Sequence, residues 1–276
     1  MSAVYEVSLN PHMRSSKSIR EIYWKLSAVL LLPVIAGIVF FHLQAVRILL
    51  FSILSFFSGE WLSGHLLKIK PQISSGQPVL SALIFTLLIP LNSKPEAVIL
   101  SGLLASLLIS GFFGGLGHSI FHPALMGIIF LNSIFGVSQA GSLSMVDSHV
   151  LLMIACSLIL LFLKGIRTDL PLIFLGSLAL VSIPLNPASP VEVLNSRMIF
   201  SAIFLLADPV YLPVSIHGKR WFALASAVLI GVLNGPSGSI AGLCSCFLIL
   251  NALTGFFDAK GKPKPVLNPF LKAAKA

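Results

Sequence analysis

The chain has 276 residues, of which 56% are hydrophobic and 10% are charged, and its mean hydropathy is +0.98. A soluble domain carries about 25% charged residues, so this chain lacks the charge that a water-facing surface needs. Composition therefore excludes an ordinary soluble enzyme, a nucleic-acid-binding module and a disordered protein. It predicts an all-α, multi-pass membrane protein with room for at most roughly ten to twelve spans of about 20 residues each.

The intervals between charged residues predict where those spans lie, because charges are rare inside a bilayer. Most intervals hold one apolar helix, and the two longest are each divided by a glycine-rich break. The resulting spans, about ten in all, lie between Lys25 and Arg47, at about 45–67 with Glu60 inside, at about 78–90, twice between Glu96 and Asp147, between Asp147 and Lys164, between Asp169 and Glu192, as a short span between Arg197 and Asp208, and twice between Arg220 and Asp258.

An even number of spans places both chain ends on the same side of the membrane. That side then holds all of the 18 Lys and Arg residues except Arg47, Lys94 and Arg197. Positive charge collects in cytoplasmic loops, so both termini are predicted to be cytoplasmic. The predicted organisation is an N-terminal segment over 1–25, one membrane domain over 26–258 and a basic tail over 259–276.

Two stretches of the chain resemble each other. Residues 78–85, which lead to Pro90, match residues 198–205, which lead to Pro209, and each is followed by a polar turn, an apolar span and a glycine-rich break. Five spans separate the two stretches, so the halves have opposite orientations, as in an inverted repeat with its binding site between the repeats. The predicted repeats cover about 26–136 and 149–258, although a chance match between apolar sequences stays open.

The glycine-rich segment 114–124, G-G-L-G-H-S-I-F-H-P-A, interrupts two predicted spans. Unwound backbone at membrane depth must be buried in protein or line a cavity. Proline suits the first turn of a helix, where free N–H groups can face an anionic group. A tight cytoplasmic turn between two helices explains the segment equally well. The candidate cofactor-binding residues are Gly114, Gly115, Gly117, His118, Phe121, His122 and Pro123.

Four polar residues inside predicted spans are candidates for an ion pathway. Intramembrane carboxylates are functional candidates by default, which singles out Glu60 and Asp208. Asn132 and Asn251 lie in the spans that follow the glycine-rich breaks. The alternatives are a cytoplasmic turn that starts at Asp208, before Pro209, and a Glu60 that is either buried and paired or placed near the cytoplasmic interface.

No metal site is predicted. The three cysteines, Cys156, Cys244 and Cys246, lie in apolar runs and are expected to be buried as small hydrophobic side chains. His118 and His122 are four residues apart and would share a face if that segment were helical. Two such ligands alone are weak evidence for a metal.

Segment 114–124 resembles the motif G-G-[LI]-G-x-N-x-F-N-P-A of the RnfD/NqrB family, which comprises the RnfD protein of the Rnf electron-transport complex and the NqrB protein of the sodium-pumping NADH:quinone reductase. Residues 10–14 resemble the S-P-H-x-R stretch of that family, and residues 202–210 resemble its A-F-F-x-x-T-D-P-V stretch. Ser119 and His122 stand where the family motif has asparagines.

The resemblance implies a ten-helix, 5+5 inverted-repeat fold similar to urea transporters, in a bacterial inner membrane. It also implies a translocase subunit, not catalytic by itself, which works with other membrane and cytoplasmic subunits of an electron-transport complex. In that family electrons pass through membrane flavins, and their passage is coupled to movement of Na+ or H+. The alternative on the same fold is a non-redox transporter or channel for a small solute.

Family members often carry FMN bonded to a threonine in an outer loop. Gly141 stands where that threonine is expected, and glycine has no hydroxyl group to esterify. Covalent FMN is therefore not expected, and a flavin (FMN or riboflavin) would have to bind non-covalently.

Overall fold

The computed structural model describes residues 18–68, 73–114, 118–137, 143–148, 154–156, 159, 169–185, 195–234 and 239–261. Within these residues the regular structure is helical, apart from an isolated bridge between Pro90 and Ser144. The helices are α1 (Ile19–Leu67), α2 (Gln77–Leu88), α3 (Pro95–Phe112), α4 (Pro123–Ser133), α6 (Asp169–Leu185), α7 (Ser196–Phe200), α8 (Ile216–Asn234), α9 (Ile240–Ala252) and α10 (Thr254–Gly261), with the short turns η1 (Ile73–Ser75) and η2 (Met145–Ser148) and the π-helical turn η4 (Ser201–Leu205).

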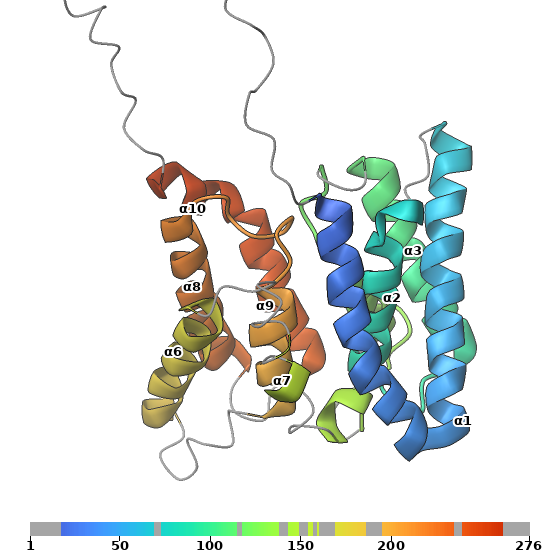
Figure 1. Cartoon of the computed structure of the whole chain (residues 1–276), viewed down its shortest axis with the longest axis horizontal. Helices are drawn as coiled ribbons and strands as arrows, with labels where there is room; N and C mark the ends of the chain where they lie inside the picture. Colours follow the sequence, from blue (N-terminus) through green and yellow to red (C-terminus); the bar gives the residue numbers. More distant parts are fainter. Residues whose placement is uncertain are drawn as a thin grey trace, which may run out of the picture.

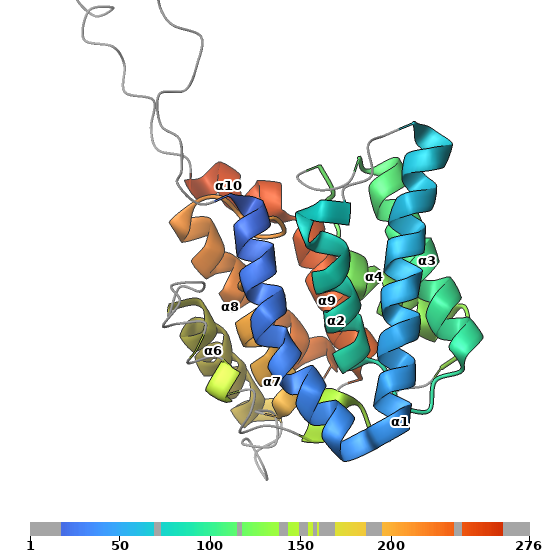
Figure 2. The same cartoon turned by 45° about the vertical axis from the view of Figure 1, so that its right-hand side comes forward.

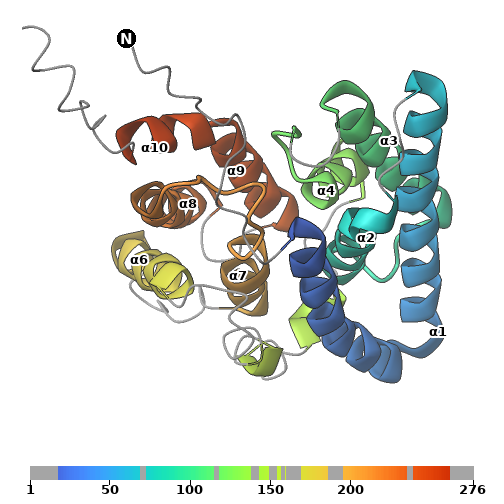
Figure 3. The ribbon, with the colours of Figure 1, turned by 45° about the horizontal axis from the view of Figure 1, so that its top comes forward.

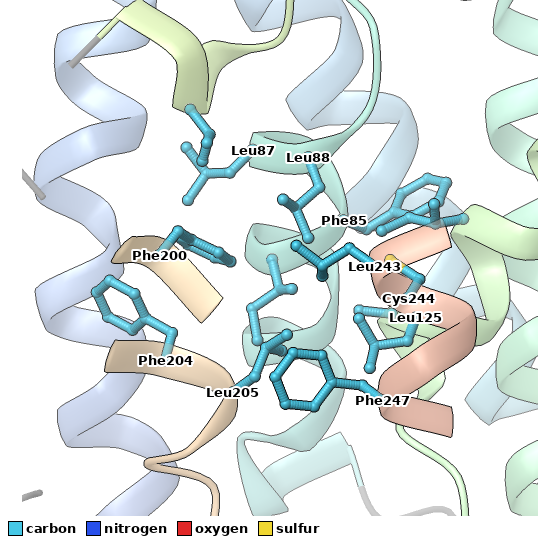
Figure 4. Close-up of a cluster of buried hydrophobic side chains, with 14 of the residues drawn as sticks. Phe85, Leu87, Leu88, Leu125, Phe200, Phe204, Leu205, Leu243, Cys244 and Phe247 are labelled. Carbon is cyan, nitrogen blue, oxygen red and sulfur yellow. The ribbon is translucent and has the colours of Figure 1, made fainter. Parts of the chain in front are cut away.

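The helices form two groups that lie side by side, α1 to α4 in one and α6 to α10 in the other (Figure 1). The first part of α1 runs along the boundary between the groups (Figures 2 and 3). Apolar side chains of both groups meet in one core, where Phe85 of α2 and Leu125 of α4 lie near Leu205 of η4 and Phe247 of α9 (Figure 4). Cys244 lies in this core, and all three cysteines are buried as predicted.

Helix α1 is a hairpin of two arms. At His42 the backbone has φ 47° and ψ −125°, which is not helical, and the chain reverses direction there (Figure 1). The arms are each roughly 35 Å long at 1.5 Å per residue, enough to cross the apolar layer of a bilayer. The two spans expected on either side of this point are therefore confirmed as helices, and the second arm contains Glu60.

Three of the described helices, α1, α3 and α8, are long and apolar enough to cross a membrane. The others are shorter, and α2 has 12 residues, which is about 18 Å of helix against an apolar layer of about 30 Å. The expected span at 78–90 is thus a short helix that ends inside the protein, followed by buried, non-helical residues up to Leu91.

The outside of the bundle is as apolar as its core. Large hydrophobic side chains such as Phe40, Leu50, Leu172 and Val232 are each more than half exposed. A helix that is apolar on all sides belongs in a protein core or a membrane. This surface, together with the long apolar helices, suits a multi-pass membrane protein.

Glycines allow α1 and α3 to pack closely. A Cβ atom at Gly59 would lie 2.7 Å from Ser106 Cβ and 2.9 Å from the backbone oxygen of Leu103, and a Cβ at Gly102 would collide with Ser55. Small residues of this kind let helices approach one another in membranes, where van der Waals packing replaces the hydrophobic effect.

The two ends of the bundle differ in charge. We call one the α10 end; it holds the first turn of α1, α10 and the start of α8, because the Asp258 carboxylate of α10 accepts hydrogen bonds from the backbone N–H groups of Val214 and Ser215. The opposite, η2 end holds the bend at His42 and η2 (Figure 1). Among the described residues, Arg20, Lys25, Lys68, Lys219 and Arg220 lie at the α10 end, and Arg47, Lys94 and Arg197 at the η2 end, which is the division that the sequence predicted.

Candidate functional site

A cluster of buried polar side chains lies between the two helix groups, toward the α10 end. We call it the polar cluster. Its members come from both groups and from segments far apart in the sequence. They are Tyr23 of α1, Gln77 at the start of α2, Ser119 and His122 before α4, Asp208 and Tyr211 in the loop before α8, and Asn251 of α9.

Asp208 is the charged centre of the polar cluster, and its residue is 1% exposed. The carboxylate oxygen Oδ1 accepts hydrogen bonds from the Tyr23 hydroxyl at 3.2 Å and from the Val210 backbone N–H at 3.0 Å. The other oxygen, Oδ2, lies 3.5 Å from His122 Nε2 and has no hydrogen bond. Because a buried charge is costly unless it is fully paired, this second oxygen is the chemically unusual atom of the site.

The local backbone explains how Asp208 reaches this place. Helix α7 continues into the π-helical turn η4, which is closed by a hydrogen bond from the Leu206 N–H to the Ser201 carbonyl at 3.3 Å. π-helical turns are rare and are frequent at functional sites. Asp208 then accepts from the N–H two residues later, a turn that aspartate favours, and Pro209 follows. Both sequence-based interpretations of Asp208 hold, since the residue starts a turn and is buried.

His122 caps the N-terminus of α4. Its Nδ1 accepts a hydrogen bond from the Ala124 backbone N–H at 3.2 Å. The neutral imidazole therefore carries its hydrogen on Nε2, the atom that faces Asp208. The imidazole ring also lies against the ring of Tyr211, with 4.9 Å between the centroids.

Tyr211 ties the remaining members together. Its hydroxyl oxygen accepts from Gln77 Nε2 at 2.8 Å and is hydrogen-bonded to the Ser119 hydroxyl at 3.1 Å. The Asn251 amide, oriented so that its nitrogen faces the two acceptors, donates to the backbone oxygens of Tyr211 and Phe247, each at 3.2 Å. The loop that carries Asp208 is thus held against α2, α9 and the segment before α4.

The sequence analysis named three members of the polar cluster as candidates, namely Asp208, His122 and Asn251. The expected neutralisation of Asp208 by Arg220 is not what the structure shows, because Arg220 Nε bonds to Asp169 at 3.0 Å. Glu60 lies elsewhere, buried between α1 and α3, where it accepts a hydrogen bond from Ser110.

The other candidates take separate places. Asn132 is half-buried on α4, roughly 15 Å along the helix from His122. Residues 118–122 are not helical, so His118 and His122 do not share a helix face; His118 is exposed whereas His122 is buried. Pro123 opens α4 as predicted, Gly114 has φ +82°, and Phe121 packs edge-on against Phe113 at 5.6 Å between centroids. Gly115, Gly117 and Gly141 lie outside the described residues.

Sequence reasoning missed Tyr23, Gln77 and Tyr211. A usable signal did exist for the two tyrosines, because the chain has 3 Tyr residues against 20 Phe residues. A hydroxyl group on a buried aromatic ring usually finds a hydrogen-bond partner, so a tyrosine inside an apolar span points to a polar neighbour.

Comparison with known proteins places the chain in a family. Residues 6–148 and 131–266 match the model of the NQR2, RnfD, RnfE family. Three relatives are each the subunit designated D of an ion-translocating oxidoreductase complex. The chain is 20% identical to that of the proton-translocating ferredoxin:NAD(+) oxidoreductase complex of Clostridium ljungdahlii, over 94% of this chain and 95% of that protein. It is 24% identical to that of the ion-translocating oxidoreductase complex of Methanosarcina acetivorans, over 95% and 97%, and 20% identical to that of the Na(+)-translocating ferredoxin:NAD(+) oxidoreductase complex of Acetobacterium woodii, over 91% and 92%. The chain therefore belongs to the NQR2, RnfD, RnfE family.

Proposed function

We propose that this chain is a membrane subunit of a multi-subunit complex that couples electron transfer to the movement of Na+ or H+. The relatives that belong to such complexes match it along nearly their full length. Electron carriers would reside largely on partner subunits, both membrane and cytoplasmic, so the chain would not be catalytic alone. Its place would be a bacterial plasma membrane, with the strongly basic α10 end and both termini facing the cytoplasm.

The proposal includes a 5+5 inverted repeat. In the first group, the two arms of α1 are followed by the short α2, the long α3 and the short α4. In the second group, α6 is followed by the short α7 with η4, the long α8 and the short α9. Helix α2 runs toward the η2 end and α7 runs away from it, which supports opposite orientations of the halves (Figure 1). The helix expected before α6 lies mostly outside the described residues.

One observation supports a place on the ion path more than any other, namely the buried Asp208 carboxylate between the two groups. Ionisable residues inside a membrane bundle are costly and usually mark ion or proton pathways. In inverted-repeat transporters the binding site lies at the interface of the repeats and is built from discontinuous helices. Asp208 follows such a short helix, and its partner Tyr23 belongs to the other group.

A flavin on this chain would be bound non-covalently, because Gly141 offers no hydroxyl group. The described start of α4 does not fit a flavin, since its Ala124 N–H already bonds to His122 and Phe121 packs on Phe113. We therefore derive no step of the ion path through a flavin.

The test is purification of the tagged chain from its own membrane in mild detergent. We expect partner subunits and bound flavin to co-purify, and redox-driven ion uptake after reconstitution into vesicles. The variant Asp208→Asn should assemble normally yet transport at least about tenfold less, a loss of about 1.4 kcal/mol or more. Solute flux through the isolated chain, with no partners and no flavin, would instead establish the transporter alternative.

A further inference from the structure

We infer that the ion bound at Asp208 is a proton, taken up on Oδ2, and that His122 is its hydrogen-bonding partner there. This inference rests on the proposed function, because it names the ion that the site would handle. The atoms that surround the carboxylate support it.

All three groups that contact the carboxylate are hydrogen donors. The Tyr23 hydroxyl and the Val210 N–H point at Oδ1 at 3.2 and 3.0 Å, and His122 Nε2 faces Oδ2 at 3.5 Å. A hard cation needs a shell of oxygen ligands, which present lone pairs. Na+ beside this carboxylate would face N–H and O–H hydrogens instead. The described residues also form no group of three or more His, Cys, Asp or Glu side chains suited to a metal ion.

Oδ2 is the free acceptor of the site. It is buried, has no hydrogen bond, and lies beyond the usual 2.7–3.2 Å range of such bonds from His122 Nε2. Leaving a buried acceptor unpaired is unfavourable, and more so when it is charged. Binding of one proton to Oδ2 converts the carboxylate into a neutral acid and removes this buried charge.

His122 is held as a donor and is not the base. Its Nδ1 lone pair is occupied by the Ala124 N–H, so a second proton on the ring would break the cap of α4. The neutral ring keeps its hydrogen on Nε2, directed at Oδ2. Proton uptake therefore changes the pair from one negative charge to none, with the proton on Asp208 and the imidazole unchanged.

Other titratable groups close to Asp208 are phenols. Tyr23 faces it from α1, and Tyr211 interacts with it electrostatically from its own loop. Glu60 acts on Tyr211 at longer range, from the second arm of α1. Among the described contacts of Asp208 there is no cation to keep the carboxylate ionised, which favours a site that a proton can enter and leave.

The first experiment is an infrared pH titration of the purified full chain. A C=O band of a protonated carboxyl group should appear as the pH is lowered, be missing in Asp208→Asn and remain in the control Asp169→Asn, whose carboxylate pairs with Arg220 at the same end. Replacing K+ by Na+ at equal ionic strength should leave the midpoint unchanged. A midpoint that falls by about one pH unit per tenfold rise in Na+ would overturn the inference, because it would show direct competition.

His122→Asn tests the pair itself. Asparagine also caps helices well, so α4 should keep its start, while the donor to Oδ2 is lost. The carboxylate then loses a stabilising group, and its affinity for a proton should rise by roughly tenfold. An unchanged midpoint would show that His122 takes no part.

Transport by the reconstituted complex separates the two proposals. Internal pH and uptake of radioactive Na+ are measured in parallel during electron transfer. Acidification without a Na+ requirement supports both proposals. Uncoupler-insensitive Na+ uptake overturns the proton inference and leaves the proposed function standing, whereas an assembled complex that moves neither ion overturns the proposed function even if Asp208 titrates as expected.

Discussion

At the η2 end, the Arg197 guanidinium grips the Asp147 carboxylate with two hydrogen bonds, Nε to Oδ1 at 2.6 Å and a terminal nitrogen to Oδ2 at 2.7 Å. The Ser144 N–H and hydroxyl add bonds to Oδ2 at 3.0 and 2.7 Å. At the α10 end, Asp208 has donors on one oxygen and none within hydrogen-bonding range on the other. Both contacts link α7 and its following loop to other parts of the chain, yet one is balanced and the other is not.

That difference separates a fastening from a reactive site. Burial by itself raises the pKa of the Asp147 carboxyl, but hydrogen bonds from Arg197 and Ser144 outweigh it and hold this pKa below its ordinary value. Asp147 therefore stays ionised and fixed. Asp208 lacks a comparable cation among its described contacts, so its charge can change, and the surrounding loop is held by Tyr211 and not by the carboxylate.

The largest effect on stability is expected from Arg197→Ala. It leaves Asp147 unpaired in a site where both side chains are less than one-fifth exposed (16% and 17%), and breaking such a pair costs about 3 kcal/mol. Unfolding of the detergent-purified chain measures the loss. The double variant Asp147→Ala/Arg197→Ala is the control and should lose less than the sum of the single variants. Wild-type stability of Arg197→Ala would show that the pair is incidental.

Tyr23→Phe probes the other end and should act mainly on proton affinity. Removal of the hydroxyl takes one of two donors from Oδ1 and keeps the aromatic ring in place. Because a hydrogen bond to the charged form lowers a carboxyl pKa, the infrared midpoint of Asp208 should rise by about one pH unit, or about 1.4 kcal/mol. A midpoint equal to that of the wild type would mean that Val210 alone holds Oδ1.

Composition and charge spacing predicted much of this arrangement. They placed both arms of α1, the division of basic residues between the two ends, and Asp208 and His122 as candidate residues. Each of these rests on local information, since a run without charges or a carboxylate in an apolar stretch is visible in a window of about 20 residues.

The polar cluster itself was not predictable in the same way. Tyr23 and Asp208 are 185 positions apart, so no local pattern indicates that they touch. Hydropathy also overestimated α2, because the buried, irregular residues Ile89 and Leu91 are as apolar as the helix before them. The positive φ at His42 carried no glycine to announce it. Tertiary packing fixes each of these features.

The pH dependence of stability should come from the η2 end. Asp147 has a lower pKa folded than unfolded, so its contribution is fully present above the unfolded value, about 4, and disappears as the pH falls through the folded value. Thermal unfolding followed from neutral to acid pH should show a steeper decline for the wild type than for Asp147→Ala/Arg197→Ala. Parallel curves would indicate that other carboxylates dominate acid unfolding.

The smallest effect is expected from Lys25→Ala, although Lys25 lies two residues from Tyr23. Its ion pair with Glu21 at 2.5 Å has side chains 42% and 44% exposed, and solvent screens such a pair to less than about 0.5 kcal/mol. Neither unfolding nor the infrared midpoint of Asp208 should change measurably. A marked rise of the midpoint in Lys25→Ala would show that a distant positive charge, and not the three donors around the carboxylate, sets its affinity for a proton. The contrast between the two ends would then be one of surface potential, since the same basic residues that crowd the α10 end would govern the buried acid beneath them.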